Sequence, residues 1–377
     1  MSELSLPNKD HFMPLTGVRC IAAYLVYIHH FNPFNPKLFG NSFAAFTNEF
    51  HVGVTLFFVL SGFLIAHRYM DIKHFSWRNY FVNRFARIYP IYFLLTIFTF
   101  IFSAYTLNVD GIESIKLFFL NITFLKGFSD HLKFSGISAA WSLTVEETFY
   151  FVAPLIFLFI KRNRVFIIFL PVFFIAIGMA LVYILSFSKN IIFFENYKFM
   201  FSYTFFGRCI EFFSGIALSI FLKKNNGYKQ GFKYTLTGIS VIVISILLIS
   251  LIKGNEDFGI RKPSGIFINN IILPLFGVTV FYYGLIVEKT LVSKILESRL
   301  LILLGKSSYI FYLIHDGFIA NITRVYLNNY IVIFVFINFV SIILFKFVEE
   351  PMNLYLRKKF RKDIVVSSSN IKQHLSI

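Results

Sequence analysis

Long apolar segments follow one another along this chain, and short segments with polar and turn residues separate them. A run of about 20 apolar residues is long enough to cross the hydrocarbon core of a membrane as a helix. The pattern predicts an all-α polytopic membrane protein. We expect about ten transmembrane helices, at residues 14–32, 51–70, 88–106, 143–160, 165–187, 199–222, 234–253, 266–286, 300–320 and 330–349. The segment 113–126 is apolar but short, which favours an interfacial or re-entrant helix.

The composition agrees with this class. Of 377 residues, 57% are hydrophobic and 15% are charged, whereas a soluble domain has about 25% charged residues. Cys20 and Cys209 both fall within apolar runs, so we interpret them as buried small side chains and not as a disulfide framework. The first apolar run is long for a signal peptide and has no small-residue cleavage pattern after it. We therefore expect it to remain as the first transmembrane helix.

The distribution of Lys and Arg predicts the orientation. If the N-terminus is cytoplasmic, 23 of the 36 Lys and Arg fall in cytoplasmic segments and 10 in outer loops. Cytoplasmic loops carry an excess of these residues, so we expect both termini in the cytoplasm. This asymmetry accounts for most of the net charge of +17 and makes a nucleic-acid partner unnecessary. We expect one membrane domain at 1–352 and a basic, disordered cytoplasmic tail at 353–377.

The first predicted span, Met13–Phe31, carries ionisable residues in an apolar setting. Arg19 and His30 are eleven positions apart, which places them on one helix face, separated by roughly 16 Å along the axis. Such residues are costly in hydrocarbon and usually functional, and a histidine can accept a proton or act as a nucleophile. His29 points about 100° away from His30, so at most one of the two histidines should lie on the helix face of Arg19. The alternative is a helix-end histidine that is hydrogen-bonded at the headgroup level.

A basic segment precedes the third predicted span, and Pro90 marks the entry into that span. Arg84 and Arg87 are three positions apart and share a helix face, and Arg78 lies six positions before Arg84. Guanidinium groups bind phosphate in a bidentate manner, so a phosphate-bearing cytoplasmic donor is one interpretation. The other is ordinary positive-inside charge in contact with lipid headgroups.

Three further positions carry candidate chemistry. The pair Ser61-Gly62 interrupts the second span, where small residues permit close helix packing or the approach of a ligand. Ser142 and Glu146 are four positions apart and share a face near the start of the fourth span. A carboxylate there could orient an imidazole or polarise a hydroxyl, although an acidic residue at a helix start is also favoured by the helix dipole. His315 lies within the ninth span.

Taken in order, six motifs resemble one family: TGVRCIAAYLVYIHHF, LFFVLSGFLI, RFARIYP, WSLTVEETFYF, LGKSSYIFYLIH and FVEEP. The set is similar to the membrane-bound acyltransferase-3 family, which includes O-acetyltransferases of bacterial surface glycans. The motifs cover most of 13–154 and about 303–352, and the middle matches only in hydropathy. Many members have Asp and Gly where this chain has Thr16 and Cys20, and an acidic residue where it has Thr55.

The resemblance assigns roles to individual residues. It places the family's arginine and essential histidine on Arg19 and His30, and its tryptophan-serine and glutamate motif on Trp141, Ser142 and Glu146. Its arginine pair, implicated in acyl-CoA handling, falls on Arg84 and Arg87. We also expect Arg78 near the donor phosphates, and Ser61 and His315 near the acceptor.

The resemblance implies an enzyme, a multi-pass O-acyltransferase of the inner (plasma) membrane. It would move an acyl group, most simply acetyl, from cytoplasmic acetyl-CoA to a hydroxyl of a surface glycan or glycolipid, with no metal. His30 would act as base or as transient acyl carrier, while Glu146 and Trp141 would shape the acceptor end. Some members carry an added SGNH-type hydrolase domain; this sequence ends too soon for one, so we expect transfer to finish in the membrane domain or on a separate protein. The competing hypothesis is a secondary transporter or flippase, which would also use buried Arg, His and Glu.

Overall fold

The computed structural model describes residues 12–34, 36–72, 74–107, 111–187, 192–224, 227, 229–317, 319–320, 323 and 329–361. Within these ranges the secondary structure is helical, and the one sheet-like feature is an isolated bridge between Lys229 and Glu288. The predicted all-α class is therefore confirmed.

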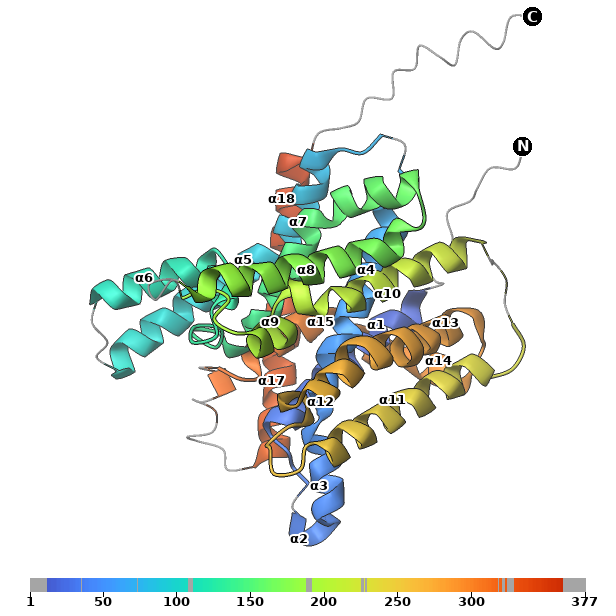
Figure 1. Cartoon of the computed structure of the whole chain (residues 1–377). Coiled ribbons are helices and arrows are strands. Elements are labelled where there is room, and N and C mark those ends of the chain that lie inside the picture. Colours follow the sequence, from blue (N-terminus) through green and yellow to red (C-terminus); the bar gives the residue numbers. More distant parts are fainter. Residues whose placement is uncertain are drawn as a thin grey trace, which may run out of the picture.

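The longer helices pack side by side (Figure 1). They are α1 (Met13–His30), α4 (Gly53–Tyr69), α5 (Trp77–Leu107), α7 (Trp141–Arg162), α8 (Phe166–Ser186), α10 (Phe205–Lys224), α11 (Lys233–Ile252), α15 (Arg299–Ile314) and α17 (Tyr330–Leu344). Shorter α-helices connect or extend them: α2 (Pro36–Phe39), α3 (Asn41–Asn48), α6 (Gly111–Ile122), α9 (Tyr197–Tyr203), α12 (Pro263–Phe267), α13 (Thr279–Val287), α14 (Leu291–Leu296) and α18 (Glu350–Phe360). The 3-10 turns are η2 (Phe50–Val52), η3 (Leu125–Phe128), η4 (Ser138–Ala140) and η5 (Gly259–Arg261), and the π-helical segments are η6 (Ile268–Val278) and η7 (Phe345–Glu349).

Eight helical stretches among the described residues are long and apolar enough to cross a membrane. They match eight of the ten predicted spans: Asn41–Tyr69, Trp77–Ser103, Ser138–Arg162, Phe166–Ser186, Tyr197–Lys224, Lys233–Ile252, Pro263–Val287 and Tyr330–Phe360. The other two predicted spans are α1, which has 18 residues and includes Arg19 and two histidines, and α15, which has 16 residues. The count of ten and the orientation of the termini stay predictions.

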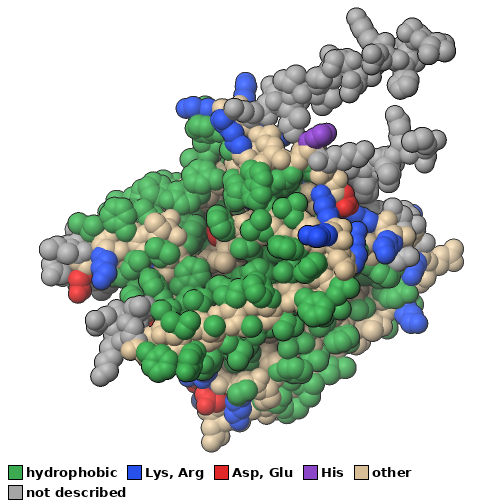
Figure 2. Space-filling model, turned by 45° about the horizontal axis from the view of Figure 1, so that its top comes forward, with side chains coloured by type: hydrophobic (Ala, Val, Ile, Leu, Met, Phe, Trp, Pro, Cys, Tyr) green, Lys and Arg blue, Asp and Glu red, His purple; other side chains and the backbone are tan. Residues whose placement is uncertain are grey.

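The surface fits a membrane environment. Figure 2 shows a face covered by hydrophobic side chains, with Lys and Arg gathered toward its margins. The helices α8, α11 and α17 present most of their apolar side chains on the outside, whereas α4 and α10 are largely buried. The helices α4 and α10 are therefore the centre of the bundle, and the others shield them.

Glycines set the closest helix contacts. A Cβ at Gly62 on α4 would meet the backbone of Phe212, and a Cβ at Gly215 on α10 would meet the backbone of Val59. Small residues allow two membrane helices to approach this closely. Helix packing is therefore what Gly62 provides, as one of the two interpretations of the Ser61-Gly62 pair predicted.

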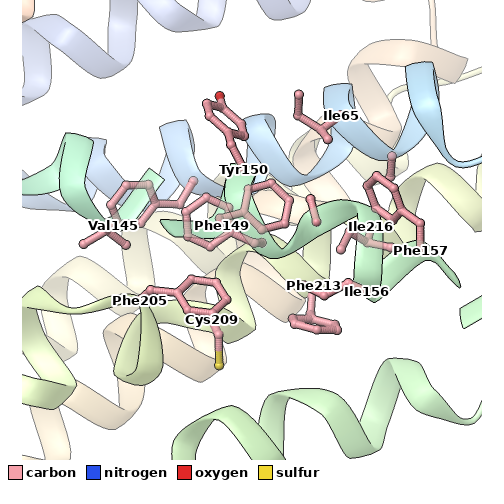
Figure 3. Close-up of a cluster of buried hydrophobic side chains, with 14 of the residues drawn as sticks. Ile65, Val145, Phe149, Tyr150, Ile156, Phe157, Phe205, Cys209, Phe213 and Ile216 are labelled. Carbon is pink, nitrogen blue, oxygen red and sulfur yellow. The ribbon is translucent and has the colours of Figure 1, made fainter. Parts of the chain in front are cut away.

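An aromatic and aliphatic core lies between α4, α7 and α10 (Figure 3). The rings of Phe149 and Phe212 stack with centroids 4.4 Å apart, and Phe205 packs beside them. Tyr150 comes from the same helix as Phe149 but turns its hydroxyl away from this cluster (Figure 3). The core thus holds α7 in the position from which Tyr150 and its neighbours reach a polar interior.

Two predicted boundaries differ from the structure. Pro90 lies inside α5, which begins at Trp77, so the segment with Arg84 and Arg87 is already helical. A proline is tolerated in a membrane helix because neighbouring groups satisfy the freed backbone carbonyl. At the other end, α18 continues to Phe360, because Pro351 occupies the first turn of that helix, where its missing N–H costs nothing. The predicted tail start at residue 353 therefore falls within a helix, and residues 362–377 lie outside the described ranges.

Candidate active site

A cavity of about 850 Å³ opens between α1, α7, α9 and the segments 130–139 and 258–261. Its lining includes three imidazoles, those of His29, His30 and His51, together with Trp141 and Tyr312. The charged side chains in the lining come from the loop 130–133, from α9 and α10, and from η5. They are Asp130, Lys133, Lys198, Arg208 and Arg261. This end of the molecule, where α2 and α3 lie, is opposite to α18 in Figure 1.

The predicted catalytic histidine, His30, faces this cavity beside a carboxylate. Its Nδ1 lies 3.8 Å from Asp316 Oδ2, and Ser138 Oγ donates a hydrogen bond of 3.0 Å to the same oxygen. The side chains of His30 and Asp316 are 34% and 27% exposed. His30 belongs to the cavity lining, and Asp316 does not. Sequence reasoning missed Asp316, although it directly follows His315 at the end of the ninth predicted span.

The other two histidines of this region have fixed ring orientations. His29 Nδ1 lies 2.5 Å from the carbonyl oxygen of Asn48, and His315 Nδ1 lies 2.7 Å from that of Tyr312. A carbonyl can only accept, so Nδ1 carries the proton in both rings. His315 is fully buried, its ring centroid lies 5.1 Å from that of His30, and its Nε2 has no hydrogen-bond partner within the described part of the chain. It stands behind His30 and is not part of the cavity lining.

The structure places Trp141 and Ser142, the two residues of α7 predicted to bind the acceptor, in different surroundings. Trp141 lines the cavity and packs edge-on against Tyr203, with ring centroids 4.9 Å apart. Ser142 is buried behind it, donates 3.0 Å to the carbonyl of Ala139, and lies 2.9 Å from the hydroxyl of Tyr312. Ser142 therefore positions Tyr312 and does not face the cavity itself.

A buried ion pair that the sequence analysis did not single out borders the cavity. Arg208 binds Glu211 through two parallel hydrogen bonds of 2.6 and 2.7 Å, and it also donates 3.2 Å to Thr55 Oγ1. Arg208 is 4% exposed and Glu211 is fully buried. Two opposite charges three positions apart in an apolar run are the signal that could have revealed this pair.

Two predicted residues meet in the interior. Glu146 on α7 accepts hydrogen bonds from Ser61 on α4 and from Tyr150 one turn further along α7. Arg19 on α1 lies within electrostatic reach of Glu146 and Glu349. Ser61, Glu146 and Arg19 thus belong to one polar interior, and none of them lines the cavity that contains His30.

Phe57 lies next to both the polar interior and the cavity lining. The guanidinium carbon of Arg19 lies 5.9 Å from the centroid of the Phe57 ring. Phe57 also packs edge-on against Tyr312, with centroids 5.7 Å apart. The ring therefore contacts one residue of the interior and one residue of the cavity lining.

Four arginines gather on the opposite side of the interior. Arg357 on α18 lies within electrostatic reach of Arg68, Arg84 and Arg87. We call these four residues the arginine cluster. Arg84 is 6% exposed and lies over the Tyr150 ring, 5.4 Å from its centroid, and the Nε atoms of Arg84 and Arg357 have no hydrogen-bond partner among the described residues. Arg68 is exposed, and Arg87 and Arg357 are half-buried. Several guanidinium groups close together, some of them accessible to solvent, are suited to bind an anion.

Arg78 does not belong to the arginine cluster. It is exposed, and its Nε donates 3.0 Å to the carbonyl of Phe360 at the end of α18. Its spacing of six positions from Arg84 turns it to a different face of α5. Arg357 and Arg68 were missed because they come from the ends of α18 and α4, whose approach to α5 is a tertiary feature.

The loops around the cavity are held by buried polar groups. Burial raises the pKa of the Asp130 carboxyl, but hydrogen bonds from Lys133 and Asn196 more than offset this effect, so the pKa lies below its usual value. Burial lowers the pKa of Lys126 to about 7, and this side chain donates to the carbonyls of Ser135 and Ile137. These contacts fix the segment that carries Ser138.

The fold and this interior define a polytopic membrane-type protein with ionisable groups at both ends of a helical bundle. The model of the acyltransferase-3 family, described as "Acyltransferase domain", matches residues 15–347. The match covers most of the chain, which therefore belongs to this family of acyltransferases. The family predicted from the six ordered motifs is confirmed.

The chain is also similar to curated proteins that are named as O-acetyltransferases. "Putative O-acetyltransferase SAS0844" of Staphylococcus aureus (strain MSSA476) is 25% identical over 383 residues, which cover 94% of this chain and 58% of that protein. "O-acetyltransferase OatA" of Staphylococcus aureus (strain NCTC 8325 / PS 47) is 26% identical over 382 residues, which cover 93% of this chain and 58% of that protein. The chain spans less than two thirds of the length of these relatives. No solved structure matches the chain.

Proposed function

We propose that this protein is a membrane O-acetyltransferase that moves an acetyl group from cytoplasmic acetyl-CoA to a hydroxyl of a glycan or glycolipid on the outer side. The observation that carries the proposal is the placement of Arg19 and His30 on one helix, α1. Arg19 lies in a polar interior near the arginine cluster, and His30 lies in the opposite cavity beside Asp316.

The arginine cluster is the proposed donor site. Coenzyme A carries several phosphates, and guanidinium groups bind phosphate through parallel charge-assisted hydrogen bonds. Arg84 and Arg87 were expected here, and Arg68 and Arg357 complete the set. We assign no donor contact to Arg78, because its guanidinium is directed to the end of α18.

The cavity is the proposed acceptor site. Its volume of about 850 Å³ lies within the usual range of ligand pockets, roughly 300–1,000 Å³. Trp141, Tyr203 and Phe258 offer flat apolar faces to sugar rings, while the loop residues Asp130 and Lys133 offer polar contacts. His30 stands at this site as the base or as the carrier of the acyl group.

The acetyl group has to pass Phe57 to travel from one site to the other. In acyl transfer the new bond to the acyl carbon forms as the bond from that carbon to the CoA sulfur breaks, and the sulfur leaves as a thiolate. Ser61, Glu146 and Arg19 surround the inner side of Phe57 and would bind the polar thioester. A rotation of the Phe57 ring would open the passage.

Transfer in sealed proteoliposomes tests the proposal and separates it from a transporter. Purified protein is reconstituted in vesicles that contain extracted surface glycan, and acetyl-labelled acetyl-CoA is added outside. We expect label to become covalently bound to glycan in the lumen when the side of the protein with the arginine cluster faces outward. Label that accumulates only as free solute in the lumen would contradict acyl transfer and support a transporter.

A further inference from the structure

A second histidine–carboxylate pair faces the same cavity as His30. His51 lies in η2 at the start of α4, and its Nε2 is 3.0 Å from Glu49 Oε2. Glu49 is fully buried, and its other oxygen accepts a 3.0 Å hydrogen bond from the backbone N–H of Gly259. Neither residue has a role in the function proposed above.

The tautomer of His51 follows from this contact. A carboxylate only accepts hydrogen bonds, so Nε2 of His51 carries the proton and Nδ1 keeps a lone pair. Within the described part of the chain, Nδ1 makes no hydrogen bond, and the side chain is 11% exposed and lines the cavity. His51 is therefore an oriented base whose free nitrogen is available to a bound ligand.

His51 lies close enough to His30 to share a substrate with it. The ring centroid of His29 is 4.9 Å from that of His30 and 5.4 Å from that of His51. His29 itself is fixed by Asn48 and by Phe258, whose ring centroid lies 4.8 Å away. The His29 ring thus lies between the rings of His30 and His51. A single sugar residue bound in the cavity is large enough to reach both.

We propose, on the basis of the function proposed above, that His51 with Glu49 is the base that deprotonates the acceptor hydroxyl, and that His30 carries the acyl group. In the first step a His30 nitrogen attacks the thioester carbon, the C–N bond forms, and the C–S bond breaks to release the CoA thiolate. In the second step the acceptor oxygen attacks the same carbon, its proton goes to His51 Nδ1, and the C–N bond breaks with its electron pair returning to His30. His51 then gives its proton to solvent, which protonates the thiolate.

The division of roles has a chemical reason. A nitrogen that holds an acyl group has no lone pair with which to accept a proton, so a second base is needed in the second step. The Glu49 carboxylate stabilises the imidazolium that forms on His51. The pair His30–Asp316 cannot serve both steps in the same cycle.

The two half-reactions test this assignment separately. Purified protein is mixed with acetyl-CoA without acceptor, and the rapid burst of released CoA is measured. Label transfer to glycan is then measured in membrane vesicles of the producing cell, which hold the native acceptor. In His51→Gln we expect the burst to stay within about two-fold of wild type, while transfer falls roughly 100-fold. The retained burst also shows that the variant is folded.

Further variants sharpen the result. Glu49→Gln should reduce transfer less than His51→Gln does and should also keep the burst, and added imidazole should restore part of the transfer in His51→Ala. His74→Gln, which changes an exposed histidine outside the cavity lining, serves as the matched control. Full transfer by His51→Gln, or loss of burst and transfer together, would overturn the inference. A wild-type protein with neither burst nor transfer would instead refute the proposed function.

Discussion

His30 Nδ1 lies 3.8 Å from Asp316 Oδ2, although 286 positions separate the two residues in the chain. Asp316 is held by the hydroxyl of Ser138, so the carboxylate has a fixed position beside the imidazole. A carboxylate in this position orients the ring and favours its protonated or acylated form.

Asp316→Asn should lower kcat roughly ten-fold, or more, and leave the KM for acetyl-CoA unchanged. The amide oxygen keeps the hydrogen bond from Ser138, so the substitution removes charge with little change in shape. Steady-state kinetics with acetyl-CoA and extracted glycan provide the measurement. An unchanged kcat would show that the carboxylate does not act on His30.

If the arginine cluster binds acetyl-CoA, removing an arginine of the cluster should raise the KM for acetyl-CoA, and removing an arginine outside it should not. Arg357→Gln should raise the KM for acetyl-CoA roughly 10- to 100-fold, since a hydrogen bond to a charged group is worth about 1.5–3 kcal/mol. Arg78→Gln is the matched control. It removes an arginine on another face of α5, and within the described part of the chain this arginine donates its hydrogen bond to the carbonyl of Phe360. Equal KM values in the two variants would remove Arg357 from the donor site.

The position of Phe57 predicts that removing its ring increases the hydrolysis of acetyl-CoA. Phe57→Ala should open the passage between Arg19 and Tyr312 and let water reach the acyl group, so hydrolysis of acetyl-CoA without acceptor should rise several-fold. Phe98→Ala, at a half-exposed position on α5, removes the same side chain without touching the passage. Release of CoA and free acetate in purified protein is the measurement, and equal hydrolysis in both variants would show that Phe57 does not seal the site.

The hydrogen bond between Ser61 and Glu146 predicts energetic coupling between α4 and α7. Ser61→Ala and Glu146→Gln should each destabilise the protein, and the double variant should be destabilised by less than the sum. Coupling of about 0.5–3 kcal/mol is usual for groups in one hydrogen-bond network. Thermal unfolding in detergent measures all four proteins, and strictly additive effects would argue against the contact.

The buried Lys126, next to the segment that carries Ser138, predicts that the stability of the folded state depends on pH. Its pKa is lowered to about 7 by burial, while an unfolded lysine has a pKa of about 10.4. Between these values the unfolded state binds more protons, so the stability of the folded state should rise with pH and should be flat below about 7. The melting temperature should therefore rise several degrees more in wild type than in Lys126→Met between neutral pH and about pH 9.5. Equal slopes would show that Lys126 is not desolvated.

Local spacing predicted much of this molecule. The apolar runs located the helices, and the eleven-residue spacing of Arg19 and His30 on α1 identified a residue of the polar interior and a residue of the cavity. The spacing of residues along the chain could not predict that Ser61 contacts Glu146, because 85 positions separate them. The sequence analysis named each residue as a candidate, and only the packing of α4 against α7 brings the two together.

The missed residues were missed for two physical reasons. Asp316 and Arg357 acquire a role only through helices that are distant in sequence, and no periodicity reports such a contact. His51 lies in the turn η2 and Glu49 directly before it, and an ionisable residue in a turn has many ordinary explanations. Arg78 was included by its nearness to Arg84 in the chain, although its position on the helix turns it elsewhere.

The most direct test of the central claim is acetyl transfer by a His30→Gln variant, compared with His74→Gln, in membrane vesicles supplied with labelled acetyl-CoA. If the acetyl group reaches the acceptor through His30, the His30 variant should lose transfer by at least roughly 100-fold, while His74→Gln should match wild type. Transfer by His30→Gln at the wild-type rate would contradict both roles proposed for that imidazole.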